Sequence, residues 1–377
     1  MANVVKPHGA VKPFHGLTPS PEPPGPYNKK EEVTPWISPV IIDKLSLFFT
    51  MSDAEHVEAI REGLKDPKAV KGDVLIGGLF LTKARITKAR VRFLLLGPDP
   101  DGIVSSLGSK VPGAPTFHVE LWANGICRFD WNPSKWDAGQ RAHLWPGLAR
   151  ILLTPPEGEA HNLGGYSGPP LSRLLAHATI TRVDAAVDVF GIPLDTVSFW
   201  DDKPDRKVYD RVDGLGTVYQ GKLAKTGNRF LAYDKTRERR EALADRKGMD
   251  TAARAAACAA MPDPWIRLEV VRTNPNLRGE CLAGLPNPFK AIRCAIPATA
   301  FPAANYPPPD GRGTLALLMA VVGVPRALAA IPCPVLRGKL TTALNGATPD
   351  WWNPTRIWKG WPDAVRDVLP SPAPACN

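Results

Sequence analysis

The chain has 377 residues, including 41 prolines and 32 glycines, and its 47 Lys and Arg residues against 37 Asp and Glu residues give a net charge of +10. Hydrophobic residues make up 44% of the chain, enough for an ordinary core, so the high proline content does not indicate wholesale disorder. The positive charge indicates a polyanionic partner, either nucleic acid or an anionic membrane surface. No apolar run reaches the roughly 18 residues of a membrane-spanning helix, so no interaction within a membrane is predicted.

The cysteines and histidines do not suggest a zinc site or a histidine metal centre. The six cysteines include no Cys-x-x-Cys pair, and none of the seven histidines belongs to a His-x-His or His-x-x-x-His pair. Widely spaced cysteines are typical of reduced thiols rather than of a disulfide framework. The first residues also lack the apolar segment of a signal peptide. We therefore predict a cytoplasmic protein.

The predicted elements begin after a flexible proline-rich tail at residues 1–36. In the first half the pattern predicts, in chain order, a strand at 41–49, a helix from a Ser52–Glu55 capping box to about residue 64, strands at 74–81 and 85–96, and a hairpin of strands 117–122 and 125–131. The Asn124-Gly125 pair within that hairpin predicts a type I′ turn.

The second half continues with helices and strands in alternation. The pattern predicts helices at 138–152 and 171–178, strands at 179–190, 216–220 and 229–233, a long charged helix at 236–261 and a strand at 265–272. Beyond residue 274, recurring proline favours only short helices. We therefore divide the chain into the tail, a domain at 37–275, and a proline- and tryptophan-rich C-terminal region at 276–377 that binds DNA or a partner.

Four of the predicted strands carry polar residues on one face and apolar residues on the other. Because side chains alternate along a strand, the residues that share a polar face are Arg128, Asp130 and Asn132; Arg182, Asp184 and Asp188; Tyr233 and Lys235; and Arg267 and Glu269. If these strands pair in one sheet, their polar faces converge into one site. A solvated face with Arg–Asp pairs explains a single strand equally well.

Such a site would suit phosphodiester chemistry on DNA. Carboxylates without histidine or cysteine are the ligands of a hard cation such as Mg²⁺ or Mn²⁺. Lys235 would favour the phenolate of Tyr233 and so lower the pKa of this tyrosine from its usual value near 10. Tyr233 is then a candidate nucleophile towards phosphorus, although a plain core tyrosine also fits the pattern. Tyr219 is a second tyrosine in the region, but its sequence neighbours are neutral.

The order of these motifs resembles the trans-acting replication initiation factors of rolling-circle plasmids and filamentous phages, whose relatives include relaxases of conjugative elements. The resemblance covers roughly residues 40–275 and rests on the segments 42–45, 128–135, 182–188, 216–221, 232–235 and 266–269. It implies an α+β fold, an antiparallel sheet core with helices packed on one side. Such folds are related to the His-hydrophobe-His nickases, although this sequence lacks their histidine pair.

The resemblance also implies a reaction. Tyr233 would attack one DNA strand at an origin, form a 5′-phosphotyrosine with a free 3′-OH, and later rejoin the strand. The implied roles are phosphate contacts or transition-state stabilisation by Lys235, Arg182 and Arg267, and metal ligation by Asp184, Glu269, Asp188 and Asp130. The implied partners are origin DNA, a host helicase and a polymerase, and a homo-oligomer is compatible with them. The alternatives are a conjugative relaxase with the same chemistry and a non-catalytic DNA-binding regulator.

Basic and aromatic clusters complete the predicted DNA contacts. The first basic cluster comprises Lys222, Lys225 and Arg229, and the second comprises Lys88, Arg90 and Arg92. Solvated hairpin tips would explain both clusters equally well. Four tryptophans, Trp351, Trp352, Trp358 and Trp361, either stack on unpaired bases or seal the C-terminal region onto the core.

Overall fold

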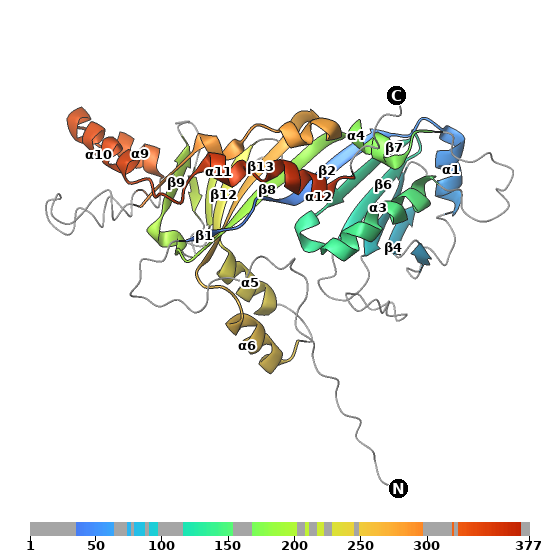
Figure 1. Cartoon of the computed structure of the whole chain (residues 1–377), viewed down its shortest axis with the longest axis horizontal. Coiled ribbons are helices and arrows are strands. Elements are labelled where there is room, and N and C mark those ends of the chain that lie inside the picture. The colour runs from blue at the N-terminus through green and yellow to red at the C-terminus, as the bar shows by residue number, and fades with distance from the viewer. Residues whose placement is uncertain are drawn as a thin grey trace, which may run out of the picture.

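The computed structural model describes residues 35–63, 74–76, 79–86, 90–96, 116–153, 168–201, 208–210, 217–221, 228–244, 249–296, 319 and 323–370. These residues form a large antiparallel sheet with helices across one face and a smaller sheet beside it (Figure 1). The predicted α+β class with an antiparallel sheet is therefore confirmed.

The large sheet has twelve strands in the spatial order β10-β11-β12-β13-β8-β2-β7-β6-β5-β4-β3, with β1 paired to β8 outside this path. The strands are β1 (Trp36–Ile37), β2 (Ile41–Thr50), β3 (Val74–Ile76), β4 (Leu79–Ile86), β5 (Arg90–Leu96), β6 (Thr116–Trp122), β7 (Ile126–Trp131), β8 (Thr179–Phe190), β10 (Val208–Asp210), β11 (Thr217–Gly221), β12 (Arg229–Asp234) and β13 (Trp265–Arg278). The smaller sheet pairs β9 (Ser198–Asp201) with β14 (Ile292–Ala295). Strands far apart in sequence thus become neighbours at the centre, where β8 lies between β13 and β2.

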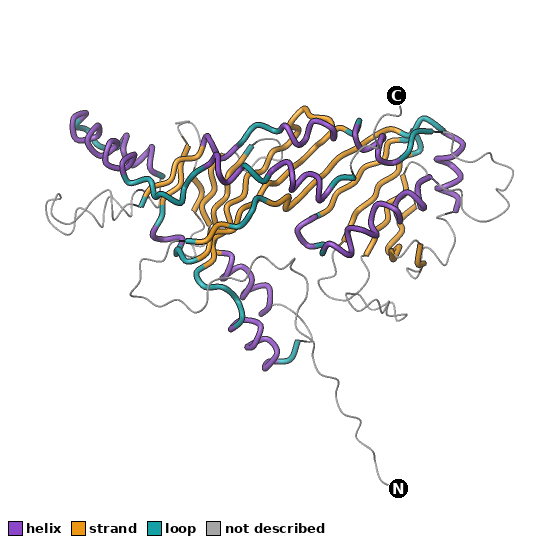
Figure 2. The backbone as a smooth tube through the Cα atoms, viewed as in Figure 1, coloured by secondary structure: helices purple, strands orange, loops and turns teal. Residues whose placement is uncertain are grey.

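The α-helices are short, and several of them lie across one face of the large sheet (Figures 1 and 2). They are α1 (Ala54–Gly63), α3 (Ala138–Leu153), α4 (Leu171–Ala176), α5 (Lys235–Ala244), α6 (Thr251–Ala259), α9 (Val324–Ala329), α10 (Pro334–Gly346), α11 (Pro354–Trp358) and α12 (Trp361–Val368). In α12, Trp361, Val365 and Val368 are buried at the spacing of one helical face, which places that face on the core. Figure 2 shows α5 and α6 projecting away from the sheet.

Alternation along the central strands produces the core. In β8, Val183, Val187 and Val189 are fully buried on one face, and in β13 Ile266 and Leu268 are buried on the corresponding face. The residues between them carry the polar groups of the predicted site. One face of the sheet therefore holds the hydrophobic core beneath the helices, and the other holds the charged residues.

The C-terminal tryptophans pack onto this core. The indole N–H groups of three of them donate hydrogen bonds to backbone carbonyls: Trp352 to Ile292 at 3.2 Å, Trp358 to Leu285 at 3.2 Å, and Trp361 to Leu282 at 2.9 Å. Trp352 and Trp361 are buried. For these two rings the structure agrees with packing rather than with stacking on bases. The predicted domain boundary near residue 275 falls inside β13, and residues on both sides of it contribute to one hydrophobic core.

Two helix predictions were wrong in detail. Helix α1 is capped by Asp53, whose side chain accepts a hydrogen bond from the His56 backbone N–H at 2.8 Å, so Ser52 does not open it. The single helix expected at 236–261 is two helices, because Asp250 is extended and its side chain caps α6 by accepting from the Ala253 N–H. A good N-cap residue inside a helix-forming sequence starts a new helix rather than continuing the old one.

The structure also differs from two predictions about strands and their turns. The strand expected at 85–96 is divided between β4 and β5, which pair as antiparallel neighbours. The β6–β7 hairpin is confirmed, but its turn is not type I′. The Gly125 N–H donates to the Trp122 carbonyl at 2.9 Å, and among the turn residues only Gly125 has a positive φ, of 80°. This is a three-residue loop with glycine in the left-handed position.

Candidate functional site

The four polar strands predicted to converge do belong to one sheet, in the order β12-β13-β8-β2-β7. Across β12, β13 and β8, Tyr233 pairs with Arg267, and Arg267 pairs with Asp188. Across β8 and β2, Asp184 pairs with Lys44. Directly opposite residues of an antiparallel pair point to the same face, so these groups form one continuous polar surface. We call this surface the polar face.

Arg267 is the most highly connected side chain of the polar face. Its Nε and Nη2 each donate to Asp188 at 2.8 Å, and its Nη1 donates to Asp43 Oδ1 at 3.0 Å. The guanidinium is buried, which acts to lower its pKa, but Asp188 and Asp43 outweigh burial and raise the pKa of Arg267. Arg267 therefore remains charged between two carboxylates, directly opposite Tyr233.

A second arginine–carboxylate pair lies on β8 itself. Arg182 Nε donates to both oxygens of Asp184, at 2.8 and 3.1 Å, and its Nη2 donates to Oδ2 at 2.5 Å. Asp184 is buried, and this burial raises its pKa even though Arg182 acts to lower it. This is the Arg–Asp pair that the sequence pattern also allowed.

Asp130 has its own partners on the neighbouring strand β2. Lys44 Nζ lies 3.1 Å from Asp130 Oδ1, and Ser46 Oγ donates to Asp130 Oδ2 at 2.8 Å. With both oxygens engaged, Asp130 forms a separate ion pair beside Arg182 and Asp184 rather than joining Glu269.

Glu269 differs from these aspartates because it has no ion pair or hydrogen bond within the described part of the chain. It lies on β13 opposite Ala186 and is only 9% exposed. Burial, followed by the nearby charges of Asp43 and Asp184, raises the pKa of Glu269 from 4.5 to about 7. Glu269 is thus a buried carboxylate with spare hydrogen-bonding capacity.

The environment of Tyr233 differs from the prediction. Burial raises the pKa of the phenol; Arg267 acts to lower it, whereas Glu269 and Asp43 raise it further. Lys235 begins α5 directly after β12 ends at Asp234, and the net effect of the surroundings of Tyr233 is a raised pKa, in which burial is the largest cause.

Lys235 has a different partner. Its Nζ lies 2.7 Å from Glu238 Oε2, one turn along α5, and 5.3 Å from the centre of the Tyr233 ring. Burial, together with the charge of Arg267, lowers the pKa of Lys235. The expectation that Lys235 gives Tyr233 a lowered pKa was wrong, because burial raises the pKa of this phenol.

The predicted metal ligands are only partly brought together. Among the residues that the structure describes, no group of three or more His, Cys, Asp or Glu side chains is arranged to hold a metal ion. Asp184 and Glu269 are diagonal neighbours on β8 and β13, a relation that corresponds to Cα atoms roughly 7–8 Å apart. Mg²⁺ is commonly held by one or two carboxylates together with water and substrate phosphates, and Asp184 and Glu269 are the candidates here, but both oxygens of Asp184 already accept hydrogen bonds from Arg182. Asp188 is occupied by Arg267.

The predicted DNA-binding residues are only partly described. Lys222, Lys225 and Lys88 lie outside the described residues. Arg229 lies on β12 opposite Val271, whereas Arg90 and Arg92 lie on β5, where their backbones pair with β6. Five strands separate β12 from β5, and the strands that carry the carboxylates lie between them in the strand order.

Asp43 and Ser134 are members of the site to which the sequence assigned no role. Ser134 Oγ donates to Asp43 Oδ1 at 2.6 Å. Burial acts to raise the pKa of Asp43, but Arg267 and Ser134 outweigh it and hold the pKa below its usual range. The sequence did contain a signal for the position of Asp43. Consecutive core residues of a regular strand are two positions apart, but Ile42 and Leu45 are three positions apart.

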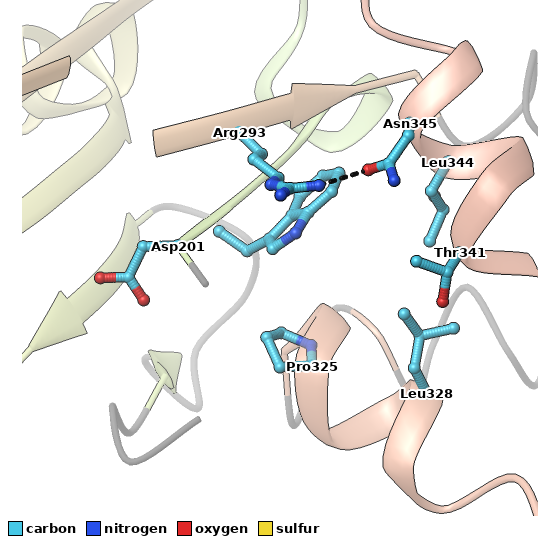
Figure 3. A pocket seen from close by; sticks show the side chains of 8 residues that line it. Asp201, Arg293, Pro325, Leu328, Thr341, Leu344 and Asn345 are labelled. Carbon is cyan, nitrogen blue, oxygen red and sulfur yellow. Dashed lines mark hydrogen bonds between the residues drawn. The ribbon is translucent and has the colours of Figure 1, made fainter. Parts of the chain in front are cut away.

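A cavity of about 210 Å³ lies elsewhere, between the small sheet and the helices α9 and α10 (Figure 3). Arg293 on β14 donates a hydrogen bond to Asn345 on α10 at 2.8 Å, and Thr341, Leu344 and Leu328 line the helical side. None of the predicted site residues that the structure describes lines this cavity.

No family model and no curated protein matches the chain. Within the described residues, no helix is both long and apolar enough to cross a bilayer. Any assignment of function must therefore follow from the residues of the polar face.

Proposed function

We propose that this chain is a rolling-circle replication initiator that nicks one DNA strand through Tyr233 and later rejoins it. The observation that carries the proposal is the alignment of Tyr233, Arg267 and Asp188 across three neighbouring strands, with Glu269 and Asp184 beside them. A phenol next to a guanidinium and several carboxylates has the groups required for attack on a phosphodiester. The net charge of +10 is consistent with a DNA partner. The proposal includes the fold relation to the His-hydrophobe-His nickases.

In the proposed reaction, the phenol of Tyr233 gives its proton to water and its oxygen forms a bond to phosphorus. The bond from phosphorus to the 3′-oxygen breaks, and that oxygen takes a proton from water to become a free 3′-OH. Arg267 and Arg182 would stabilise the negative charge that accumulates on the non-bridging oxygens. Rejoining is the reverse, with a 3′-OH attacking the phosphotyrosine. A host polymerase would extend the free 3′-OH behind a host helicase.

The proposed cofactor is Mg²⁺ or Mn²⁺, held by Asp184 and Glu269. Four carboxylates, those of Asp43, Asp184, Asp188 and Glu269, surround the guanidinium groups of Arg182 and Arg267. This negative excess would repel a DNA phosphate, and it would be reduced by a bound cation. Such an ion would polarise a phosphate oxygen.

Two alternatives use the same polar face. A conjugative relaxase would have the same chemistry and would differ in transferring the nicked strand between cells. A non-catalytic DNA-binding regulator is favoured by the pairing of Asp184 and Asp188 with arginines, because such pairs also stabilise a fold without any reaction.

The test is a comparison of the wild type with Tyr233→Phe and Tyr219→Phe, the latter being a matched control on β11. Each protein is incubated with Mn²⁺ and a labelled pool of single-stranded oligonucleotides of random sequence. Protein–DNA adducts that survive boiling in detergent are separated and sequenced. We expect adducts from the wild type and from Tyr219→Phe, and none from Tyr233→Phe, which lacks the attacking oxygen.

The other outcomes separate the candidate functions. Adducts from Tyr233→Phe at the wild-type level would show that Tyr233 is not the nucleophile. Wild-type protein that shifts DNA on a native gel but forms no adduct would favour the regulator.

A further inference from the structure

Strand β2 changes the face occupied by its side chains at Asp43. Ile42, Leu45 and Leu47 face the core, so two residues, Asp43 and Lys44, lie between the core positions Ile42 and Leu45, where a regular strand has one. The pairing of β2 with β8 shifts register between Ile42 and Lys44, which marks a β-bulge. A bulge re-aims a side chain, and here both Asp43 and Lys44 reach groups of the polar face.

The segment that follows β7 holds Asp43 in place. The side-chain amide of Asn132 donates to the Asp43 backbone carbonyl at 3.0 Å, and Ser134 Oγ donates to its carboxylate at 2.6 Å. The same carboxylate oxygen accepts from Arg267 Nη1 at 3.0 Å. Asp43 is therefore hydrogen-bonded to the segment after β7 on one side and to Arg267 of β13 on the other.

Arg267 is consequently fixed from two strands. Asp188 on β8 takes the Nε and Nη2 edge of the guanidinium, and Asp43 on β2 takes Nη1. A guanidinium has five N–H groups, so within the described part of the chain three are used and two remain for a further acceptor. Because the group is planar and rigid, contacts at both ends determine where those two N–H groups point.

We propose that Asp43 is a positioning residue: the bulge in β2 places it so that it orients the Arg267 guanidinium opposite Tyr233, with two N–H groups free for a phosphate. This inference rests on the proposed function for the identity of the acceptor. Asp43 does not touch the DNA; it acts through Arg267. Removing Asp43 would leave Arg267 attached at one edge only, and a small misplacement of a catalytic group costs up to about 100-fold in rate.

The test compares Asp43→Ala, Asp43→Asn and Ser134→Ala. An asparagine keeps an oxygen acceptor for Arg267 and Ser134, whereas alanine keeps none. With an oligonucleotide recovered from the adduct selection, we expect Asp43→Ala to lower kcat for adduct formation by about 10- to 100-fold, with KM changed by less than about threefold. Asp43→Asn should recover most of kcat, and Ser134→Ala should fall between them. Asp250→Ala removes the cap of α6 and is the control for general loss of stability.

A second measurement reads the position of Arg267 without activity. In the wild type, restricted rotation of the guanidinium should give separate Nη signals for Arg267 in ¹⁵N NMR spectra. Asp43→Ala should merge these signals, and Asp43→Asn should keep them separate.

The two measurements distinguish the possible failures. The inference would be overturned if Asp43→Ala left the Arg267 signals unchanged and also kept the wild-type kcat. It would equally be overturned if those signals were unchanged and the loss of kcat were no larger than in an Asp250→Ala protein of equal stability. If the wild type forms no adduct but Asp43→Ala still merges the signals, the proposed function fails and the positioning of Arg267 by Asp43 stands.

Discussion

Glu269 lies among acidic side chains that each have a basic partner: Asp184 is paired with Arg182, and both Asp188 and Asp43 are paired with Arg267. Glu269 is as buried as they are, yet its charge is unpaired within the described chain. Desolvation and like charges therefore favour its protonated form. Burial and the nearby carboxylates also raise the pKa of Tyr233, so its phenol is less acidic than usual although Arg267 lies opposite.

A first prediction at this scale concerns stability against pH. In the folded chain Glu269 keeps its proton up to about pH 7, whereas the ordinary pKa of a glutamate, which applies to the unfolded chain, is 4.5. Stability from this group is therefore fully present below pH 4.5 and is lost as the pH rises through 7. Glu269→Gln removes the buried charge, so it should raise the free energy of unfolding at pH 8 by up to about 3 kcal/mol and change it little at pH 5.

Urea unfolding with a chelator present measures this difference. Glu58→Gln, at an exposed residue of α1, is the control for the removal of one carboxylate from the chain. An effect of Glu269→Gln that is equal at pH 5 and pH 8 would contradict the raised pKa.

Turns and bulges decide how the strands present their side chains. The β6–β7 hairpin turns through Gly125, whose φ of 80° places it in the left-handed region. A side chain there would also meet a neighbouring chain segment, because a Cβ atom would lie 2.2 Å from the Met51 carbonyl oxygen. The hairpin holds Asp130 and, just beyond β7, Ser134, so its geometry supports the polar face.

Gly125→Ala should therefore be costly. Left-handed strain alone costs about 1–3 kcal/mol, and the contact with Met51 adds to it, so we expect a loss of at least about 2 kcal/mol in the free energy of unfolding. The matched control is Gly338→Ala in α10, where a Cβ would meet nothing within 4 Å. That change should stabilise the chain by about 0.5–1 kcal/mol, since alanine is the better helix former. Equal effects of the two variants in thermal unfolding would refute this account of Gly125.

Across the whole molecule, residues before and after position 275 share one core. Trp361 is fully buried, donates to the Leu282 carbonyl at 2.9 Å, and stacks on Trp358 with ring centres 4.4 Å apart. Trp145 of α3 donates in turn to the Val368 carbonyl at 3.1 Å. Helix α12 thus packs on the apolar face of the same sheet whose other face carries Tyr233, whereas α9 and α10 pack against the small sheet in a second hydrophobic cluster.

Trp361→Ala should accordingly destabilise the whole chain. Truncation of a buried tryptophan costs about 3–5 kcal/mol, and because the core is shared we expect the unfolding of the central sheet to move to lower temperature. Val335→Ala on α10, at a side chain 69% exposed, is the control and should have little effect. Calorimetry would contradict the prediction if Trp361→Ala shifted a separate transition and left that of the sheet in place, as independent folding of residues 276–377 would require.

Much of the fold was predictable because its signals are local. The strands at 41–49, 179–190 and 229–233 were placed within a residue or two by their apolar pattern. The break in the long helix at Asp250 could have been found from its capping residue, as could the bulge at Asp43 from the irregular spacing of core residues. The partners of the charged groups could not have been predicted, because they lie far apart in sequence: Arg267 and Asp43, which form a hydrogen bond, are 224 positions apart.

The sequence by itself determined which residues share a face of each strand, since alternation has a period of two and needs no tertiary contact. It therefore determined that Arg182, Asp184 and Asp188 share one face of their strand, and that Arg267 and Glu269 share one face of theirs. Only the tertiary structure decided which strands are neighbours, which carboxylate holds which arginine, and that Glu269 has no such partner among the residues that the structure describes. The physical reason is that desolvation and ion pairing depend on every group packed around a charge, and most of those groups come from distant parts of the chain.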